Sequence, residues 1–151
     1  GLIAAGQTIK RNVEAHTPGI SVDTILVEAM FKGLQEVLVG YRLDQQVGPV
    51  VTVAPGGIHV GIYDDKAVRL APVDRDTAQE MIAEVTGFEP LRGHRNLPRG
   101  DLDGLADIIV AMSRLAGRSD VLVVEAEANP VIVDRDSAVA VDAFVRTAAV
   151  A

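Results

Sequence analysis

The chain has 151 residues, of which 48% are hydrophobic, and its 21 acidic and 14 basic residues give a net charge of −7. This balance argues against a nucleic-acid partner, because such surfaces need clustered Lys and Arg. No apolar run approaches the roughly 18 residues that a membrane span needs, so we expect no membrane partner. The absence of Cys excludes disulfides and thiolate metal sites, and a cytoplasmic location is the default expectation.

The first half of the chain predicts one helix followed by strands. A helix is predicted over 2–15, ending at the breaker sequence "HTPG". Apolar character or alternation then predicts strands at "TILVEAM" (24–30), "EVLVGYRLD" (36–44), "GPVVTVAPGG" (48–57), "IHVGIY" (58–63) and "AVRLAPV" (67–73). The second and third of these are separated by a turn, and the last two flank "DDK" as a hairpin.

Two amphipathic helices are predicted next. The first lies within 73–87, with Asp74 or Asp76 as its cap and Gly87 at its end. The second lies within 100–117, with caps at Asp101 and Gly117. The loop between them is basic, and it carries Arg92, Arg95 and Arg99.

The last part of the chain predicts two strands, "VLVVEAEANPVIV" (121–133) and "AVAVDAFV" (138–145), joined by the turn "DRDS". Because strands and helices occur in blocks, the order of elements favours an α+β fold with a mainly antiparallel sheet and flanking helices.

Polar residues interrupt this last hairpin at one place. If Val133 pairs with Ala138, Asn129 lies opposite Asp142, and Glu127 projects to the same face as Asn129. Two carboxylates and an amide oxygen, without His or Cys, suit Mg²⁺ or Mn²⁺. The alternative is a hydrated, solvent-facing side of an edge hairpin, and a register shifted by one residue would favour it.

The motif "EANP" followed by "VDAFV" resembles the metal-binding strands of the ATP-grasp fold. The similarity is greatest to the NDP-forming acyl-CoA synthetases, which include ADP-forming acetyl-CoA synthetases and the succinyl-CoA synthetase β subunit. "TILVEAMFKGLQEVLVGYRLDQQVGPVVTVAPGG" resembles the family's hinge and first strands, and "LRGHRNLPRGDLDGLAD" resembles a later segment. The resemblance covers roughly residues 20–145, in the family's order.

The resemblance implies a division of the chain into the end of a first ATP-grasp lobe (1–25), a hinge (26–36) and a metal-bearing second lobe (37–151). The rest of the first lobe, with its Lys and Gly-rich loop, and the CoA-binding domains would belong to other parts of the same or a partner chain. A half-clamp of this kind leaves apolar surface uncovered, which would favour a homo-oligomer. The resemblance implies that Glu28, Phe31 and Glu36 seat the nucleotide, and that Glu127, Asn129 and Asp142 bind Mg²⁺.

The expected function is that of the ATP/ADP- and Mg²⁺-binding part of an acyl-CoA synthetase, which interconverts acyl-CoA, ADP and phosphate with the acid, ATP and CoA. No catalytic residue is expected within this segment, which alone would be inactive. His16, His59 and His94 do not match the family's phosphorylated His. The branch has a Glu at the position of Gly61, and the turn "DQQVGP" lacks its usual Pro and Phe.

Gly61 therefore supports an alternative, a non-catalytic regulatory module of a fused protein acetyltransferase. A third alternative is an ATP-grasp ligase that joins a carboxylate to an amine, which would share the metal strand.

Overall fold

The computed structural model describes residues 1–57, 65–93, 95 and 97–149. The chain divides into two compact units, Gly1–Met30 and Phe31–Ala151, and each is described by itself. The boundary falls within the stretch 26–36 that the sequence suggested as a hinge. The two-lobe interpretation of these units stays a prediction.

The first unit consists of helix α1 (Leu2–His16) and an extended segment after it. The helix confirms the prediction, but none of its residues is buried. The strand predicted at 24–30 is wrong: its residues form no ladder, and Ile25 packs instead onto Gly6 of α1. A strand needs a partner for its backbone N–H and C=O groups, and the described residues of this unit offer none.

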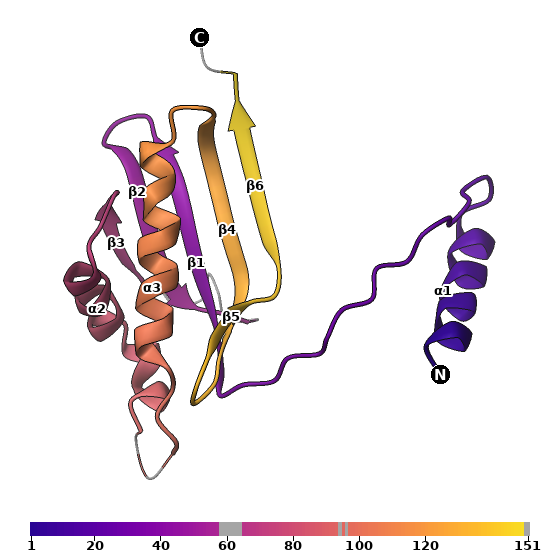
Figure 1. Ribbon diagram of the computed structural model, residues 1–151, viewed down its shortest axis with the longest axis horizontal. Coiled ribbons are helices and arrows are strands. Elements are labelled where there is room, and N and C mark those ends of the chain that lie inside the picture. The colour runs from indigo at the N-terminus through magenta and orange to yellow at the C-terminus, as the bar shows by residue number, and fades with distance from the viewer. Residues whose placement is uncertain (58–64, 94, 96, 150–151) are drawn as a thin grey trace. The chain divides into compact units, whose positions relative to one another are not determined.

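The second unit is built on a six-stranded sheet in which every described pair of strands is antiparallel (Figure 1). Its order is β3-β2-β1-β4-β5, and β6 pairs with the other end of β4. The mainly antiparallel α+β prediction is thus confirmed. The hairpin predicted for 58–63 and 67–73 lies partly outside the described residues, and its second half forms β3 against β2. The strands are β1 (Gln35–Asp44), β2 (Gly48–Pro55), β3 (Ala67–Leu70), β4 (Leu122–Val133), β5 (Ala138–Ala140) and β6 (Ala143–Ala148).

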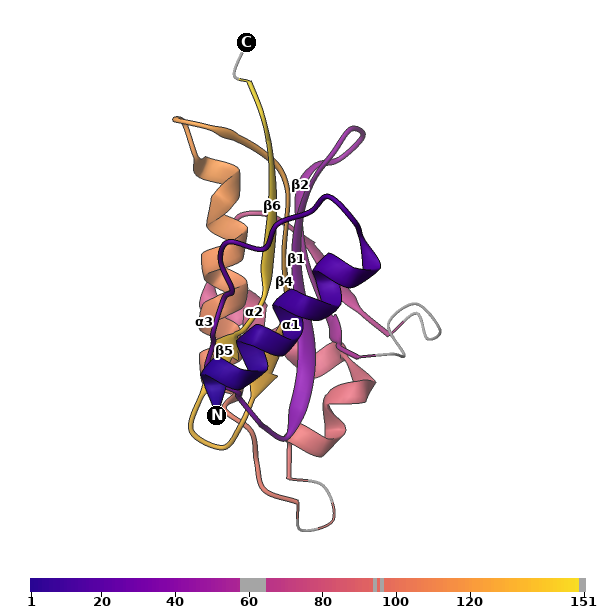
Figure 2. The same cartoon turned by 90° about the vertical axis from the view of Figure 1, so that its right-hand side faces the viewer.

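One face of the sheet forms the hydrophobic core. Alternate residues along the strands are fully buried there, among them Val37, Val39, Val51 and Val53. Helices α2 (Arg75–Glu84) and α3 (Leu102–Ser113) pack against each other and cover this face, as the side view shows (Figure 2). We call the opposite side of the sheet the open face, because no described helix of this unit covers it.

The two helices begin where the sequence predicts. Asp74 accepts a hydrogen bond from the Thr77 N–H at 2.9 Å, and Asp101 accepts one from the Gly104 N–H at 2.9 Å. The hydrogen bonds hold the pKa of the exposed Asp74 carboxyl below its usual value. After α3 the chain forms the 3₁₀ helix η3 (Arg114–Gly117), so Gly117 does mark the end of this helical stretch.

The predicted end of α2 at Gly87 is wrong. The helix ends at Glu84, and the 3₁₀ helix η1 (Thr86–Leu91) follows, with Gly87 inside it. Asp65 accepts hydrogen bonds from the Thr86 and Gly87 N–H groups at 3.0 and 2.6 Å, which directs the chain out of the α-helix. Along the described parts of the chain, no helix has the length and apolarity that a membrane crossing requires.

Candidate functional site

The hairpin of β4 with β5 and β6 has the register that the sequence predicts. Val133 pairs with Ala138 at the turn, and Ala128 pairs with Ala143 farther along the strand. Between these pairs the Asn129 N–H donates to the Asp142 carbonyl at 3.2 Å. Asn129 and Asp142 are therefore direct neighbours across the hairpin.

A β-bulge lies at the same point on the other side of β4. Val37 pairs with Val131 and Val39 pairs with Ala128, so Asn129 and Pro130 together oppose the single residue Leu38. Proline has no N–H to donate to a ladder, and a bulge is one of the few places in a central strand that accept it. The Asn129–Pro130 peptide is cis. Glu127 and Asn129 reach the open face by ordinary alternation with the buried Ala126 and Ala128, and the extra residue of the bulge then returns Val131 and Val133 to the buried face.

The side chains at this point present oxygen atoms to the open face. Asn129 Nδ2 donates to Glu127 Oε1 at 2.9 Å, which leaves the Asn129 Oδ1 atom available as an acceptor. Asp142 Oδ1 accepts from the Ala143 N–H at 2.8 Å, which leaves its second oxygen available. We call Glu127, Asn129 and Asp142 the oxygen triad.

The chemistry of the oxygen triad fits a hard cation, because carboxylate and amide oxygens are the protein ligands that Mg²⁺ and Mn²⁺ prefer. No group of three His, Cys, Asp or Glu side chains suited to a metal forms among the described residues. The Asn129 amide is therefore needed to complete a set of three ligands here.

The predicted nucleotide-binding residues lie apart from the oxygen triad along the chain. Glu36 is the first residue of β1 that lies on the open face. Its backbone carbonyl accepts a hydrogen bond from the Gly56 N–H at 2.7 Å. A Cβ atom at Gly56 would lie 2.8 Å from the Glu36 carbonyl carbon, so only glycine fits this contact. Phe31 belongs to the same unit and is 47% exposed, whereas Glu28 belongs to the first unit.

A second set of polar side chains lies across the open face, on the side of Glu127 that is away from Asn129. Arg42 of β1 pairs with Glu125 of β4, which pairs with Arg146 of β6. Arg146 donates to Glu125 Oε2 from Nε at 3.2 Å and from Nη2 at 2.9 Å. We call these three residues the arginine row. The sequence interpretation missed them, although the register that pairs Asn129 with Asp142 also pairs Glu125 with Arg146.

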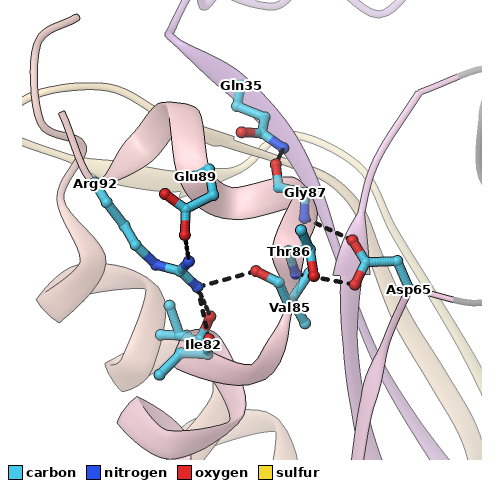
Figure 3. Close-up of polar contacts among 9 residues, drawn as sticks. Gln35, Asp65, Ile82, Val85, Thr86, Gly87, Glu89 and Arg92 are labelled. Atoms are coloured by element: carbon cyan, nitrogen blue, oxygen red, sulfur yellow. Dashed lines mark hydrogen bonds and ion pairs between the residues drawn. The ribbon is translucent and has the colours of Figure 1, made fainter. Parts of the chain in front are cut away.

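One arginine of the basic loop, Arg92, stabilises the C-terminal end of helix α2. The Arg92 guanidinium pairs with Glu89 and donates from Nη2 to the carbonyls of Ile82, Ala83 and Val85 at 2.8 to 2.9 Å (Figure 3). It thereby satisfies the carbonyls at the C-terminal end of α2. Arg95 and Arg99 are exposed, and His59, Gly61 and His94 lie outside the described residues.

The start of β1 is attached to the 3₁₀ helix η1 by hydrogen bonds and packing. Gln35 Nε2 donates to the Gly87 carbonyl at 2.9 Å, while the Gly87 N–H is held by Asp65 (Figure 3). Gln35 Oε1 is buried without a hydrogen-bond partner among the described residues. A Cβ at Gly87 would lie 2.5 Å from Pro55 Cγ, so η1 packs directly on the end of β2. This packing sets the position of Glu36, the next residue after Gln35.

Replacing Arg92 with Met is expected to destabilise the chain by about 1–3 kcal/mol, because three helix-end carbonyls lose a charged donor. Nucleotide affinity should not change, since Arg92 lies on the helix side of the sheet. Urea denaturation with parallel nucleotide titrations would check both, and exposed Arg135→Met is the matched control. A loss of affinity in a fully folded Arg92→Met protein would contradict this structural assignment.

The chain belongs to the ATP-grasp domain family, since the family model described as ATP-grasp domain matches residues 1–147. Within the family it is 36% identical over 135 residues to an ADP-forming acetate–CoA ligase I of Archaeoglobus fulgidus, covering 89% of this chain and 19% of that protein. It is also 36% identical over 139 residues to the ADP-forming acetate–CoA ligase I subunit beta of Pyrococcus furiosus, covering 92% of this chain and 60% of the subunit.

The fold is similar to that of the dinucleotide forming acetyl-coenzyme A synthetase 1 of Ca. Korarchaeum cryptofilum. One structure of that protein, in complex with coenzyme A and Mg-AMPPCP, matches with a TM-score of 0.73 and 28% identity, covering 79% of this chain and 55% of that one. The chain thus spans less than two thirds of each relative's length. These matches bear out the acyl-CoA synthetase resemblance, but they do not assign roles to individual residues.

Proposed function

We propose that this chain is the nucleotide- and metal-binding part of an ADP-forming acyl-CoA synthetase. The parent protein would interconvert acyl-CoA, ADP and phosphate with the free acid, ATP and CoA. The observation that carries the proposal is the oxygen triad at the bulge of β4, on the open face of an ATP-grasp sheet.

The oxygen triad would hold Mg²⁺, with Asn129 Oδ1 and the Asp142 carboxylate as direct ligands. Glu127 would fix the orientation of the Asn129 amide, through the 2.9 Å hydrogen bond between Nδ2 and Oε1, and would add its own charge. The cation would bridge phosphate oxygens and stabilise the charge that develops during phosphoryl transfer. Glu28, Phe31 and Glu36 would seat the adenine and the ribose.

The relatives support this proposal. The structurally similar synthetase was determined in complex with coenzyme A and Mg-AMPPCP, a magnesium-bound ATP analogue. The relatives from Archaeoglobus and Pyrococcus are named as ADP-forming ligases. These names offer no support for the regulatory acetyltransferase module, which Gly61 alone suggested.

Exposed apolar residues support the proposal that a further lobe packs on this chain. On the open face and the sheet edges, Leu70 is 62%, Phe144 55% and Val68 41% exposed. Helix α1 of the first unit has no buried residue. The rest of the first ATP-grasp lobe would cover these surfaces and supply the phosphate-binding loop, and the CoA-binding domains would lie in the same chain or in a partner subunit.

The test is to prepare the full-length parent protein and titrate it with ADP and ATP in the presence of Mg²⁺ and after its removal with EDTA. We expect binding that depends on the metal, together with formation of ATP from acetyl-CoA, ADP and phosphate. Binding without ATP formation from any of a panel of acyl-CoAs would support the regulatory alternative. A folded parent protein that binds no nucleotide would overturn the proposal.

A further inference from the structure

We propose that the arginine row holds the terminal phosphoryl group of a bound nucleoside triphosphate, with Arg146 as the principal contact and Arg42 as the second. The inference rests on the proposed function and extends it to residues to which no role has been given. Arg146 and Arg42 would be positioning residues for the phosphoryl group that is transferred.

The first argument is the order of polar groups along the open face. Glu36, Gly40 and Arg42 are alternate positions of β1, and Gly40 pairs with Glu127 while Arg42 pairs with Glu125. A strand advances about 3.3 Å per residue, so the arginine row lies roughly 7 Å beyond Glu127, on the side away from Glu36. A nucleotide with its ribose at Glu36 and its phosphates at the oxygen triad would therefore extend toward the arginines.

The second argument is charge. The carboxylates of Glu127 and Asp142 cancel the charge of one divalent cation, so the oxygen triad with its metal does not neutralise the phosphates. The arginine row carries two positive charges against the single negative charge of Glu125. In a chain with a net charge of −7, this is a positive site beside a cluster of acids. The negative charge of the phosphates that the metal leaves uncompensated would be compensated by the arginine row.

The third argument is the geometry of the Arg146 guanidinium. Glu125 Oε2 accepts from Nε and Nη2, which uses one edge of the guanidinium plane. Nη1 makes no hydrogen bond or ion pair with another described residue, so its donors are available to a ligand. Because Glu125 already fixes the plane, binding an oxyanion would order the side chain at little further cost.

The competing explanation is purely structural. Oppositely charged residues that face each other across two strands stabilise the pairing, and β6 is exposed along its whole length. A role limited to holding β6 in place would affect all nucleotides equally. A contact with the terminal phosphoryl group would instead distinguish a triphosphate from a diphosphate.

The experiment compares Mg-AMPPCP with MgADP, titrated into the full-length parent protein and its variants. Arg146→Gln should weaken Mg-AMPPCP about tenfold or more, the loss expected for a charge-assisted hydrogen bond, and should change MgADP less than about twofold. Arg42→Gln should show the same selectivity with a smaller loss. Arg135→Gln, an exposed change in the turn between β4 and β5, is the matched control and should leave both affinities unchanged.

The outcomes separate this inference from the function on which it rests. If the wild-type protein binds both nucleotides and Arg146→Gln weakens them equally, the arginine row is structural and the inference is wrong. Arg42 has no hydrogen bond or ion pair with a described residue, so Arg42→Gln decides the matter if Arg146→Gln does not fold. If the folded wild type binds neither nucleotide, the proposed function fails and this inference fails with it.

Discussion

Asn129→Ala is expected to lower the Mg²⁺-dependent affinity of the full-length parent protein for ADP and ATP by on the order of 100-fold. The substitution removes the Oδ1 ligand and the Nδ2 donor to Glu127 in one step. Glu127 would then lose the group that it orients, and the remaining carboxylates would face a cation with incomplete coordination. Calorimetric titration at several Mg²⁺ concentrations would measure the loss.

Two further variants show which part of the oxygen triad matters. Glu127→Gln keeps an oxygen that can accept from Asn129 and removes the charge, so it should cost about tenfold, a typical loss for a group that supports a ligand. Asn129→Asp places a third carboxylate against Glu127 in place of a donor, and it should weaken nucleotide binding at least as much as Glu127→Gln. Asn12→Ala, in helix α1, is the control.

The metal assignment would be wrong if Asn129→Ala, shown to be folded by thermal denaturation, bound nucleotide with wild-type affinity and the same Mg²⁺ dependence. Equal losses in the presence and absence of Mg²⁺ would also count against it, because they would indicate a distorted sheet. A loss confined to the metal-bound nucleotide is the expected result.

The hairpin was predictable because its register depends on neighbouring residues in the sequence. Once "DRDS" is the turn, the pairing of Asn129 with Asp142 follows by counting, and the structure confirms it. The bulge opposite Leu38 was harder to predict from the sequence. Pro130 indicated an irregular position, but only the pairing with β1 shows that β4 is a central strand and not an edge.

The errors arose where distant contacts decide the local structure. The end of α2 depends on Asp65, which lies 22 residues before Gly87, and on the side chain of Arg92, which folds back to the Ile82 carbonyl 10 residues earlier. The apolar segment 24–30 has the composition of a strand but no described partner in its own unit. Glu28 and Phe31 were assigned by resemblance alone, and their use as a nucleotide pocket remains a prediction.

Phe88→Ala is expected to cost about 3–5 kcal/mol of unfolding free energy, the largest stability effect that we predict. Phe88 is completely buried in η1, where it belongs to the core formed by the sheet, α2 and α3. The chain has only three Phe, and no large neighbouring side chain is free to fill the cavity without leaving its own packing. For a domain of typical stability this loss is a large fraction of the total.

The chain supplies its own control for this substitution. Phe144→Ala removes the same side chain from a position that is 55% exposed on β6, so it should change stability by less than about 1 kcal/mol. Urea denaturation of both variants should show a lower midpoint for Phe88→Ala with an unchanged slope. Because Gly87, next to Phe88, binds Gln35 at the start of β1, the cavity should also loosen Glu36. Equal midpoints for the two variants would mean that η1 is not part of the cooperative core.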